Sequence, residues 1–333
     1  MEPVTAPDAR AHVSLQERWR RLSLRYPNLR AVVAVWTVFI LMFLIGRAAG
    51  YVTAFDNQLE TTAILASFAV VVAFGQTLVI LTGGIDLSVP LTITITSVLL
   101  TGIAEGDNGK WWAVPAVLLI AFGIGLWNGI GVAFLKVSPL IMTLATNIIL
   151  LGLILIYTSG TPRGLSPPFL VDFMTGSVGP IRNVILATAV FVVVASLLLM
   201  KTVFGRYVYA VGNSQQVAFL SGVPVRTVLV GVYAVASLSY GLAGVMLTGW
   251  ARQSALNLGD PYLFPSIAAV VLGGVSILGG RGQFLGVVGG ALLFTGIGTI
   301  LAGTTVPQSY RSVIVGLVLL GAVALIQRER IGS

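Results

Sequence analysis

The sequence predicts an all-α integral membrane protein with about ten transmembrane helices, both termini in the cytoplasm (N-in/C-in), and an inverted repeat of two four-helix blocks. Composition and hydropathy support the class. Of 333 residues, 56% are hydrophobic and 9% are charged, whereas soluble domains average about 25% charged residues. The mean hydropathy is +0.98. These charges are too few to cover a soluble globule of this size, so soluble enzymes are excluded.

The individual helices are predicted from charge-free apolar runs. A transmembrane helix needs about 20 apolar residues to cross about 30 Å of hydrocarbon, and these runs are too evenly apolar for the alternating strands of a barrel. An eleventh run, 207–225, is predicted not to span because residues 212–216 at its centre are polar. The ten predicted spans are 31–46, 61–85, 87–104, 111–135, 137–162, 183–200, 227–251, 261–280, 282–310 and 312–327.

Basic residues predict the orientation of the spans, since they accumulate in cytoplasmic loops. Residues 1–30 hold six arginines and are predicted to form a cytoplasmic segment ahead of an uncleaved first span. With ten spans, thirteen basic residues face the cytoplasm and six face outside. The transmembrane domain is predicted to cover 31–327, with a cytoplasmic tail at 328–333. The net charge of +8 follows from these loops, so no nucleic-acid partner is expected.

The chain shows a coarse internal symmetry. Residues of about 61–158 and 227–327 each form a predicted block of four helices, and the first block begins outside whereas the second begins inside. A glycine-rich break lies in each block, at 82–86 in the first and between 273 and 281 in the second. Inverted repeats with glycine-interrupted helices are typical of transporters, in which the substrate path lies at the repeat interface.

A cytoplasmic loop at about 201–226 holds a predicted short helix. A polar N-cap, a following glycine and a later Pro224 delimit about two helical turns. Val217 and Leu220 share one face, with Phe219 beside them. Such a helix suits docking into a groove on another protein; the alternative is a helix lying on the membrane surface or folded back on the spans. The residues are Asn213, Ser214, Gln215, Gln216, Val217, Phe219, Leu220, Ser221 and Gly222.

Several kinds of chemistry are missing from the sequence. There is no cysteine, and His12 is the single histidine, so no metal site, thiol nucleophile or histidine-based catalytic site is expected. None of the three lysines lies in a phosphate-binding Walker A loop. The chain is therefore predicted not to be an enzyme and to hold no cofactor. Almost every charge falls at a span end, which disfavours a proton-coupled carrier, so the driving force is expected from a partner.

Asp86 follows two glycines and precedes Leu87-Ser88 at a predicted helix junction. One interpretation makes it an N-cap of the following span, since carboxylates satisfy free N–H groups at the positive end of a helix. The other makes it part of an inner gate that faces Arg281 from the matching break. The candidates for this gate or helix break are Gly83, Gly84, Asp86, Ser88, Gly279, Gly280 and Arg281.

Polar side chains inside predicted spans are a second group of candidates. Gln76, Asn128 and Asn147 carry amides that would be costly to bury unpaired. Thr143 and Asn147 are four residues apart and so share a face. Hydrogen bonding between helices is one interpretation of all four residues. A weakly binding translocation path is the other.

The stretch Gly75-Gln76-Thr77-Leu78-Val79-Ile80-Leu81-Thr82-Gly83-Gly84-Ile85-Asp86-Leu87-Ser88-Val89 closely resembles the permease subunit of bacterial ABC importers for ribose, xylose and similar monosaccharides. This group belongs to the branched-chain amino acid/ribose permease superfamily. Further matching stretches are Val137-Ser138-Pro139-Leu140-Ile141, 204–213, 221–223, 267–274 and 279–282. The resemblance covers about residues 60–327.

This resemblance implies a second permease chain, two cytoplasmic ATPase subunits that bind ATP and Mg²⁺, and a periplasmic sugar-binding protein. The loop at 204–223 would couple to the ATPase, which favours the docking interpretation of Gln215–Ser221. The sequence departs from the family pattern at Gln215-Gln216-Val217, where an acidic residue is common, and at Pro90, where glycine is usual. A branched-chain amino acid or nucleoside permease and a stand-alone ion-coupled carrier remain as alternative functions.

Overall fold

A computed structural model describes residues 29–48 and 55–304, and then 306–307, 309–311, 313–314, 316–317 and 320–321. Seven described helices are long and apolar enough to cross a membrane. Two shorter apolar helices, 89–104 and 260–272, correspond to two further predicted spans. Most of the tenth predicted span, 312–327, lies outside the described residues, as do nearly all of segment 1–30 and the tail 328–333.

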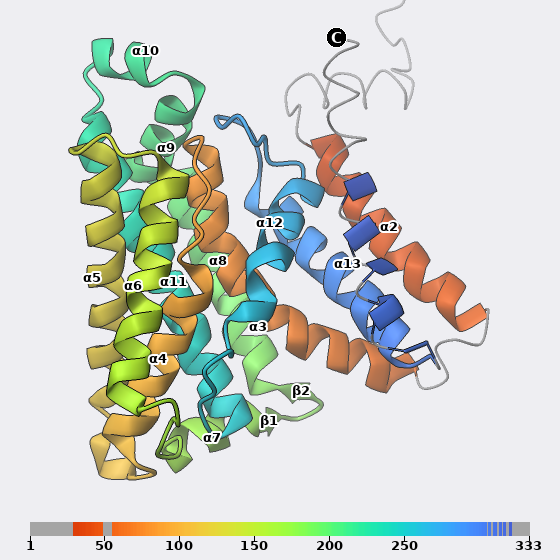
Figure 1. Ribbon diagram of the computed structural model, residues 1–333. Coiled ribbons are helices and arrows are strands. Elements are labelled where there is room, and N and C mark those ends of the chain that lie inside the picture. The colour runs from red at the N-terminus through yellow and green to blue at the C-terminus, as the bar shows by residue number, and fades with distance from the viewer. Residues whose placement is uncertain are drawn as a thin grey trace, which may run out of the picture.

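The described helices are connected by short loops and by longer non-helical segments, among them 82–88 and 273–283 (Figure 1). They are α2 Leu29–Ala48, α3 Phe55–Leu81, α4 Val89–Ala104, η1 Asn108–Lys110, α5 Ala113–Ala133, α6 Pro139–Thr158, α7 Pro168–Thr175, α8 Asn183–Lys201, α9 Val203–Asn213, α10 Gln215–Leu220, α11 Val225–Ala251, η2 Asp260–Tyr262, α12 Leu263–Leu272 and α13 Phe284–Ala302.

Helices α3 and α11 form the centre of the protein. Both are 27 residues long and mostly buried. They are joined by a hydrogen bond of 2.6 Å from Ser239 Oγ to the Val71 carbonyl. Gly75 allows close packing, since a Cβ on it would lie 2.7 Å from the Ala236 carbonyl. Helices α5 and α6 lie on one side of this pair and α2 and α13 on the other (Figure 1).

The outer helices expose apolar side chains. Ile141 and Ile156 on α6 are 65% and 79% exposed, and Val190 on α8 is 65% exposed. In water such faces would be unfavourable, whereas in a bilayer they contact lipid. The structure therefore confirms an all-α membrane protein.

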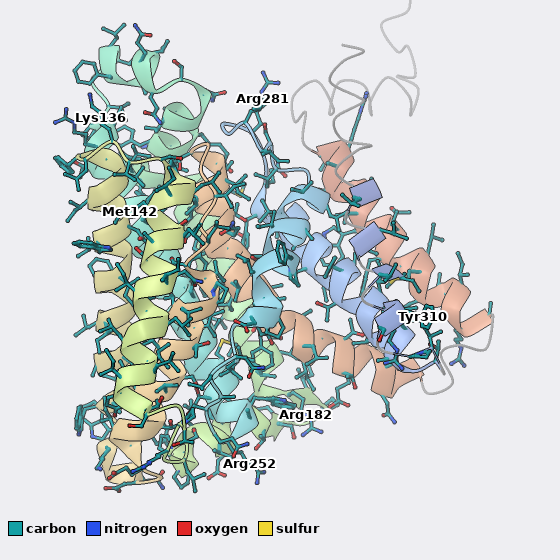
Figure 2. The ribbon with its side chains drawn as sticks, in the orientation of Figure 1. Lys136, Met142, Arg182, Arg252, Arg281 and Tyr310 are labelled. Atoms are coloured by element: carbon teal, nitrogen blue, oxygen red, sulfur yellow. The ribbon has the colours of Figure 1, made fainter. Side chains whose placement is uncertain are left out.

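A small cap closes the end of the bundle opposite α10. It consists of α7 and an antiparallel hairpin of β1 Ser177–Val178 and β2 Ile181–Arg182. Arg182 fixes the hairpin to α3 through a contact of 2.6 Å from its Nε to Glu60 Oε1. Arg182 and Arg252 lie at this end, whereas Lys136 and Arg281 lie at the end that carries α10 (Figure 2).

Several predicted spans, among them 61–85, 87–104 and 261–280, are helical only in part. Chain segment 82–88, before α4, is non-helical, and α12 ends at Leu272, well short of the predicted limit at residue 280. Gly83 and Gly274 have φ of +82° and +80°, a left-handed conformation that glycine adopts without steric cost. An apolar run records hydrophobicity but does not record where the backbone leaves the helix.

Candidate functional site

Segment 82–88, between α3 and α4, is held by a chain of buried side-chain hydrogen bonds. The Oδ1 atom of Asp86 accepts from the Ser88 N–H at 2.8 Å and from Ser88 Oγ at 2.6 Å. Ser88 Oγ in turn accepts from Asn128 Nδ2 on α5 at 3.0 Å. Thr146 Oγ1 on α6 donates to Asn128 Oδ1 at 2.6 Å. All four side chains are buried, so this network ties the segment to two neighbouring helices.

The start of α4 is capped from outside by α6. The first N–H groups of a helix have no partner within it, and Pro90 has none to offer. In the first turn, the Leu91 N–H donates to Asn147 Oδ1 at 3.4 Å. Just before the N-cap residue, the Leu87 N–H donates to Thr143 Oγ1 at 2.9 Å. The predicted shared face of Thr143 and Asn147 is confirmed, and it faces the α4 terminus.

Asp86 itself does not cap α4 in the expected way. Ser88 is the N-cap residue, and Asp86 binds its N–H, one residue before the helix begins. The second carboxylate oxygen, Oδ2, has no hydrogen-bond partner among the described residues. The local sequence therefore places the carboxylate in a tight turn that leads into the helix.

The expected meeting of Asp86 and Arg281 is absent. Asp86 is fully buried whereas Arg281 is exposed, and no ion pair joins them in the described part of the chain. Arg281 lies between Gly280 and Gly282, with φ of +72° and +148°. Its loop projects outward at the α10 end (Figure 2).

The two breaks nevertheless touch through their backbones. The Gly280 N–H donates to the Leu81 carbonyl at 2.9 Å. A Cβ on Gly279 would lie 3.2 Å from the Gly83 nitrogen. The 273–283 loop therefore packs against the end of α3, where segment 82–88 begins.

The base of α10 packs on the same junction. A Cβ on Gly212, in the last turn of α9, would contact the Leu81 carbonyl and lie 2.6 Å from the Gly280 nitrogen. Asn213 Nδ2 donates to the Gly280 carbonyl at 3.5 Å. The last residues of α9, just before α10, thus contact both the end of α3 and the second break.

Helix α10 forms where the sequence predicts it. Ser214 is the N-cap, and its Oγ accepts from the Val217 N–H at 3.3 Å. The helix ends before Gly222, whose φ is +82°. Ala218 is its buried residue, and the predicted apolar side chains point away from the bundle. Val217, Phe219 and Leu220 are 62%, 70% and 77% exposed, so α10 is not folded back on the spans.

A cavity of about 950 Å³ lies beside α10 and reaches segment 82–88. Gln215 and Gln216 line one side, and the turn between α5 and α6 lines another. Gly84 lies at its inner end against Tyr233, whose hydroxyl would be 2.7 Å from a Cβ on this glycine. The cavity therefore joins the exposed helix to the first break.

Gln76 is separate from this network. Its Oε1 accepts from the Tyr240 hydroxyl at 3.1 Å across the contact between α3 and α11, and its Nε2 has no partner in the described residues. Among the polar candidates, Asn128, Thr143 and Asn147 therefore gather at the first break and Gln76 does not.

Sequence reasoning missed two residues of the site. Thr146 shares a helix face with Thr143, three residues earlier, and this spacing could have identified it. Tyr233 carries no comparable signal, because its role depends on a long-range contact. In the described residues, no group of three or more His, Cys, Asp or Glu side chains could hold a metal ion.

Comparison with known proteins identifies similar chains. The family described as "Branched-chain amino acid transport system / permease component" matches residues 58–323. The ribose import permease protein RbsC of Bacillus subtilis is 37% identical over 267 residues, covering 78% of this chain and 81% of the relative. The galactose/methyl galactoside import permease protein MglC of Haemophilus influenzae is 31% identical over 309 residues, covering 86% and 92%.

A third relative has a different named cargo. The autoinducer 2 import system permease protein LsrC of Yersinia enterocolitica is 30% identical over 308 residues, covering 90% of this chain and 82% of the relative. No solved structure matches the chain.

Proposed function

We propose that this chain, which belongs to the family of branched-chain amino acid transport system permease components, is the membrane-spanning subunit of an ABC importer for a monosaccharide. It is a multi-pass inner-membrane protein with apolar helices. The relatives named above import ribose, galactose or methyl galactoside, and autoinducer 2. Import of a branched-chain amino acid is the second candidate, because the family description names it.

The observation that carries the mechanism is the contact of Gly212 and Asn213, just before α10, with the end of α3 and with the second break. ATP binding and hydrolysis on a partner subunit would move α10 through its exposed residues Val217, Phe219 and Leu220. Gly212 and Asn213 would pass this movement to Leu81 and Gly280. The chain itself breaks no covalent bond and only opens and closes a path.

The proposed topology places α10 in the cytoplasm, with ten spans and both termini inside. Lys136 and Arg281 at the α10 end support this orientation. An inverted repeat is supported by α3 and α11, which have equal lengths and are each followed by a non-helical segment and a short helix. The complete importer would add a second permease chain, two ATPase subunits and a periplasmic sugar-binding protein.

Because the chain has no cysteine, single-cysteine variants test the orientation and the docking directly. We expect Leu220→Cys to react with a membrane-impermeant maleimide only after the inner membrane is opened, and to crosslink to the ATPase. The control Val178→Cys, in the exposed hairpin at the other end, should react in spheroplasts without opening. Reaction of Leu220→Cys in closed spheroplasts would overturn the proposed topology.

Uptake measurements test the cargo class and the energy source. Cells that express the complete importer should accumulate a radiolabelled monosaccharide from a panel, and should not accumulate leucine. Uptake should stop when the ATPase is deleted and should survive an uncoupler while ATP is maintained. Uptake that follows the proton gradient would instead identify an ion-coupled carrier.

A further inference from the structure

The cavity beside α10 is lined by positive charges that no acidic side chain of the described residues neutralises. Lys136 and Arg226 line it, together with polar groups such as Ser138 and Gln216, and no carboxylate does. Both cations are exposed. Neither has an ion-pair partner among the described residues. The cavity is thus a cationic, hydrogen-bond-donating pocket of about 950 Å³.

One cation contacts an aromatic ring, and the other lies at an unusual backbone position. The Arg226 guanidinium lies over the Phe134 ring, 5.6 Å from its centroid, which orients its charge. Lys136 has a φ of +56°, a conformation that favours glycine and costs other residues about 1–2 kcal/mol. A lysine at such a position in the α5–α6 turn points to a use for its ammonium group. Figure 2 shows Lys136 in this turn, just below α10.

Exposed apolar side chains follow the lining residues along the chain, at the end of α5 and the start of α6. Phe134 and Leu135 precede Lys136 and are 53% and 70% exposed, and Leu140 and Ile141 at the start of α6 are 47% and 65% exposed. These residues lie at helix ends, where the hydrocarbon of a bilayer meets its headgroups. A ligand in the pocket would therefore contact cations at one end and an apolar surface at the other.

We propose that this cavity binds the headgroup of an anionic phospholipid, with its phosphate between Lys136 and Arg226 and its acyl chains along α5 and α6. Basic pockets between transmembrane helices at the cytoplasmic surface are suited to such headgroups. A soluble anion would leave the apolar rim unused, and a zwitterionic lipid would bring an ammonium group towards two cations. The proposal goes beyond the transport function and does not depend on which cargo the chain carries.

A lipid bound at this site would contact both α10 and the first helix break, the elements that are proposed to move during transport. Its lining includes Gln215 at the start of α10 and Thr82 to Gly84 of the first break. A bound headgroup would bridge the α5–α6 turn to both of them. Anionic lipid should therefore stabilise the purified chain more than zwitterionic lipid does.

The test compares phosphatidylglycerol with phosphatidylcholine on the purified full chain in detergent, by native mass spectrometry and by thermal unfolding. We expect the wild type to retain phosphatidylglycerol preferentially. The variant Lys136→Gln/Arg226→Gln should lose about thirtyfold in phosphatidylglycerol affinity, from about fivefold per cation. Lys201→Gln/Arg206→Gln removes the same charge from exposed residues that do not line the cavity, and should keep the preference.

Two further measurements make the result decisive. The charge-preserving variant Lys136→Arg/Arg226→Lys should retain the lipid preference, and normal elution of each variant in phosphatidylcholine establishes that it folds. Equal phosphatidylglycerol binding by the Gln variant and the wild type would overturn the proposal. So would a Gln variant that binds lipid normally but no longer copurifies with the ATPase, because the pocket would then receive a carboxylate of that partner.

Discussion

The two non-helical segments that meet beneath α10 are fixed by different means. Segment 82–88 is mostly buried and is held by side chains of α5 and α6, chiefly Asn128 and Thr143. The 273–283 loop is held mostly by its own backbone, as in the 2.8 Å hydrogen bond from the Ser276 N–H to the Arg281 carbonyl. Its four glycines with positive φ are Gly274, Gly279, Gly280 and Gly282.

This difference predicts how each segment responds to change. Segment 82–88 is held by a few hydrogen bonds to side chains on other helices, a network that we call the polar lock. Removing one of these partners should therefore weaken the segment without disrupting it completely. A glycine loop depends on the absence of side chains, so one added methyl group disrupts it wherever the backbone is close. The two segments meet where Gly280 contacts Leu81 at the end of α3. Movement of α10 would therefore act on both the hydrogen-bonded segment 82–88 and the glycine-rich loop 273–283.

The largest effect is expected for Gly280→Ala. The added Cβ would lie 2.6 Å from Asn213 Oδ1 and 2.9 Å from Asn213 Cα, and the left-handed φ costs about 1–2 kcal/mol in addition. We expect strongly reduced folded yield and loss of uptake, measured by fluorescence-detected size exclusion and by sugar accumulation.

Gly222→Ala is the matched control for Gly280→Ala. Its φ is also positive, at +82°, but no atom lies within 4 Å of the added Cβ. Gly222→Ala should therefore lose only the stability that the strained backbone conformation costs. If both variants lose the same amount of stability, the close approach of Gly280 to Asn213 does not contribute to stability. The proposed difference between segment 82–88 and the 273–283 loop would then be wrong.

A smaller effect is expected for Asn128→Leu, which removes the centre of the polar lock. Thr146 Oγ1 and Ser88 Oγ each lose a buried partner, and a buried group left unpaired costs about 1–3 kcal/mol. The thermal midpoint in detergent should fall, with partial loss of uptake. Combining Asn128→Leu with Thr146→Val should cost less than the sum of the two single changes. Additive losses would mean that the two side chains do not act as a unit.

Local signals in the sequence were enough to predict α10. Ser214 and Gly222 delimit it, and the spacing of Val217 and Leu220 correctly predicts an exposed apolar face. Each signal lies within a few residues of what it determines. Thr143 and Asn147 were placed on one face for the same reason.

Local sequence signals could not predict contacts between segments that are distant along the chain. The hydrogen bond from Gly280 to Leu81 joins two backbone groups, and backbone groups carry no residue-specific signal. The charges of Asp86 and Arg281 suggested a pair, but Asp86 is buried and Arg281 is exposed. Span lengths were overestimated at α12 because glycines continue an apolar run after the helix has ended.

The smallest effect is expected for Asn147→Leu, at the edge of the polar lock. Its hydrogen bond to the Leu91 N–H is long, at 3.4 Å, and the side chain is only half-buried. Loss of one such cap should cost about 0.5–1 kcal/mol and leave the substrate concentration for half-maximal uptake unchanged. Thr143→Val, which removes the 2.9 Å bond to Leu87, should destabilise more. A variant at Asn147 with unchanged stability but a severalfold weaker apparent affinity would instead place this amide on the sugar path, and the polar lock would then end at Thr143.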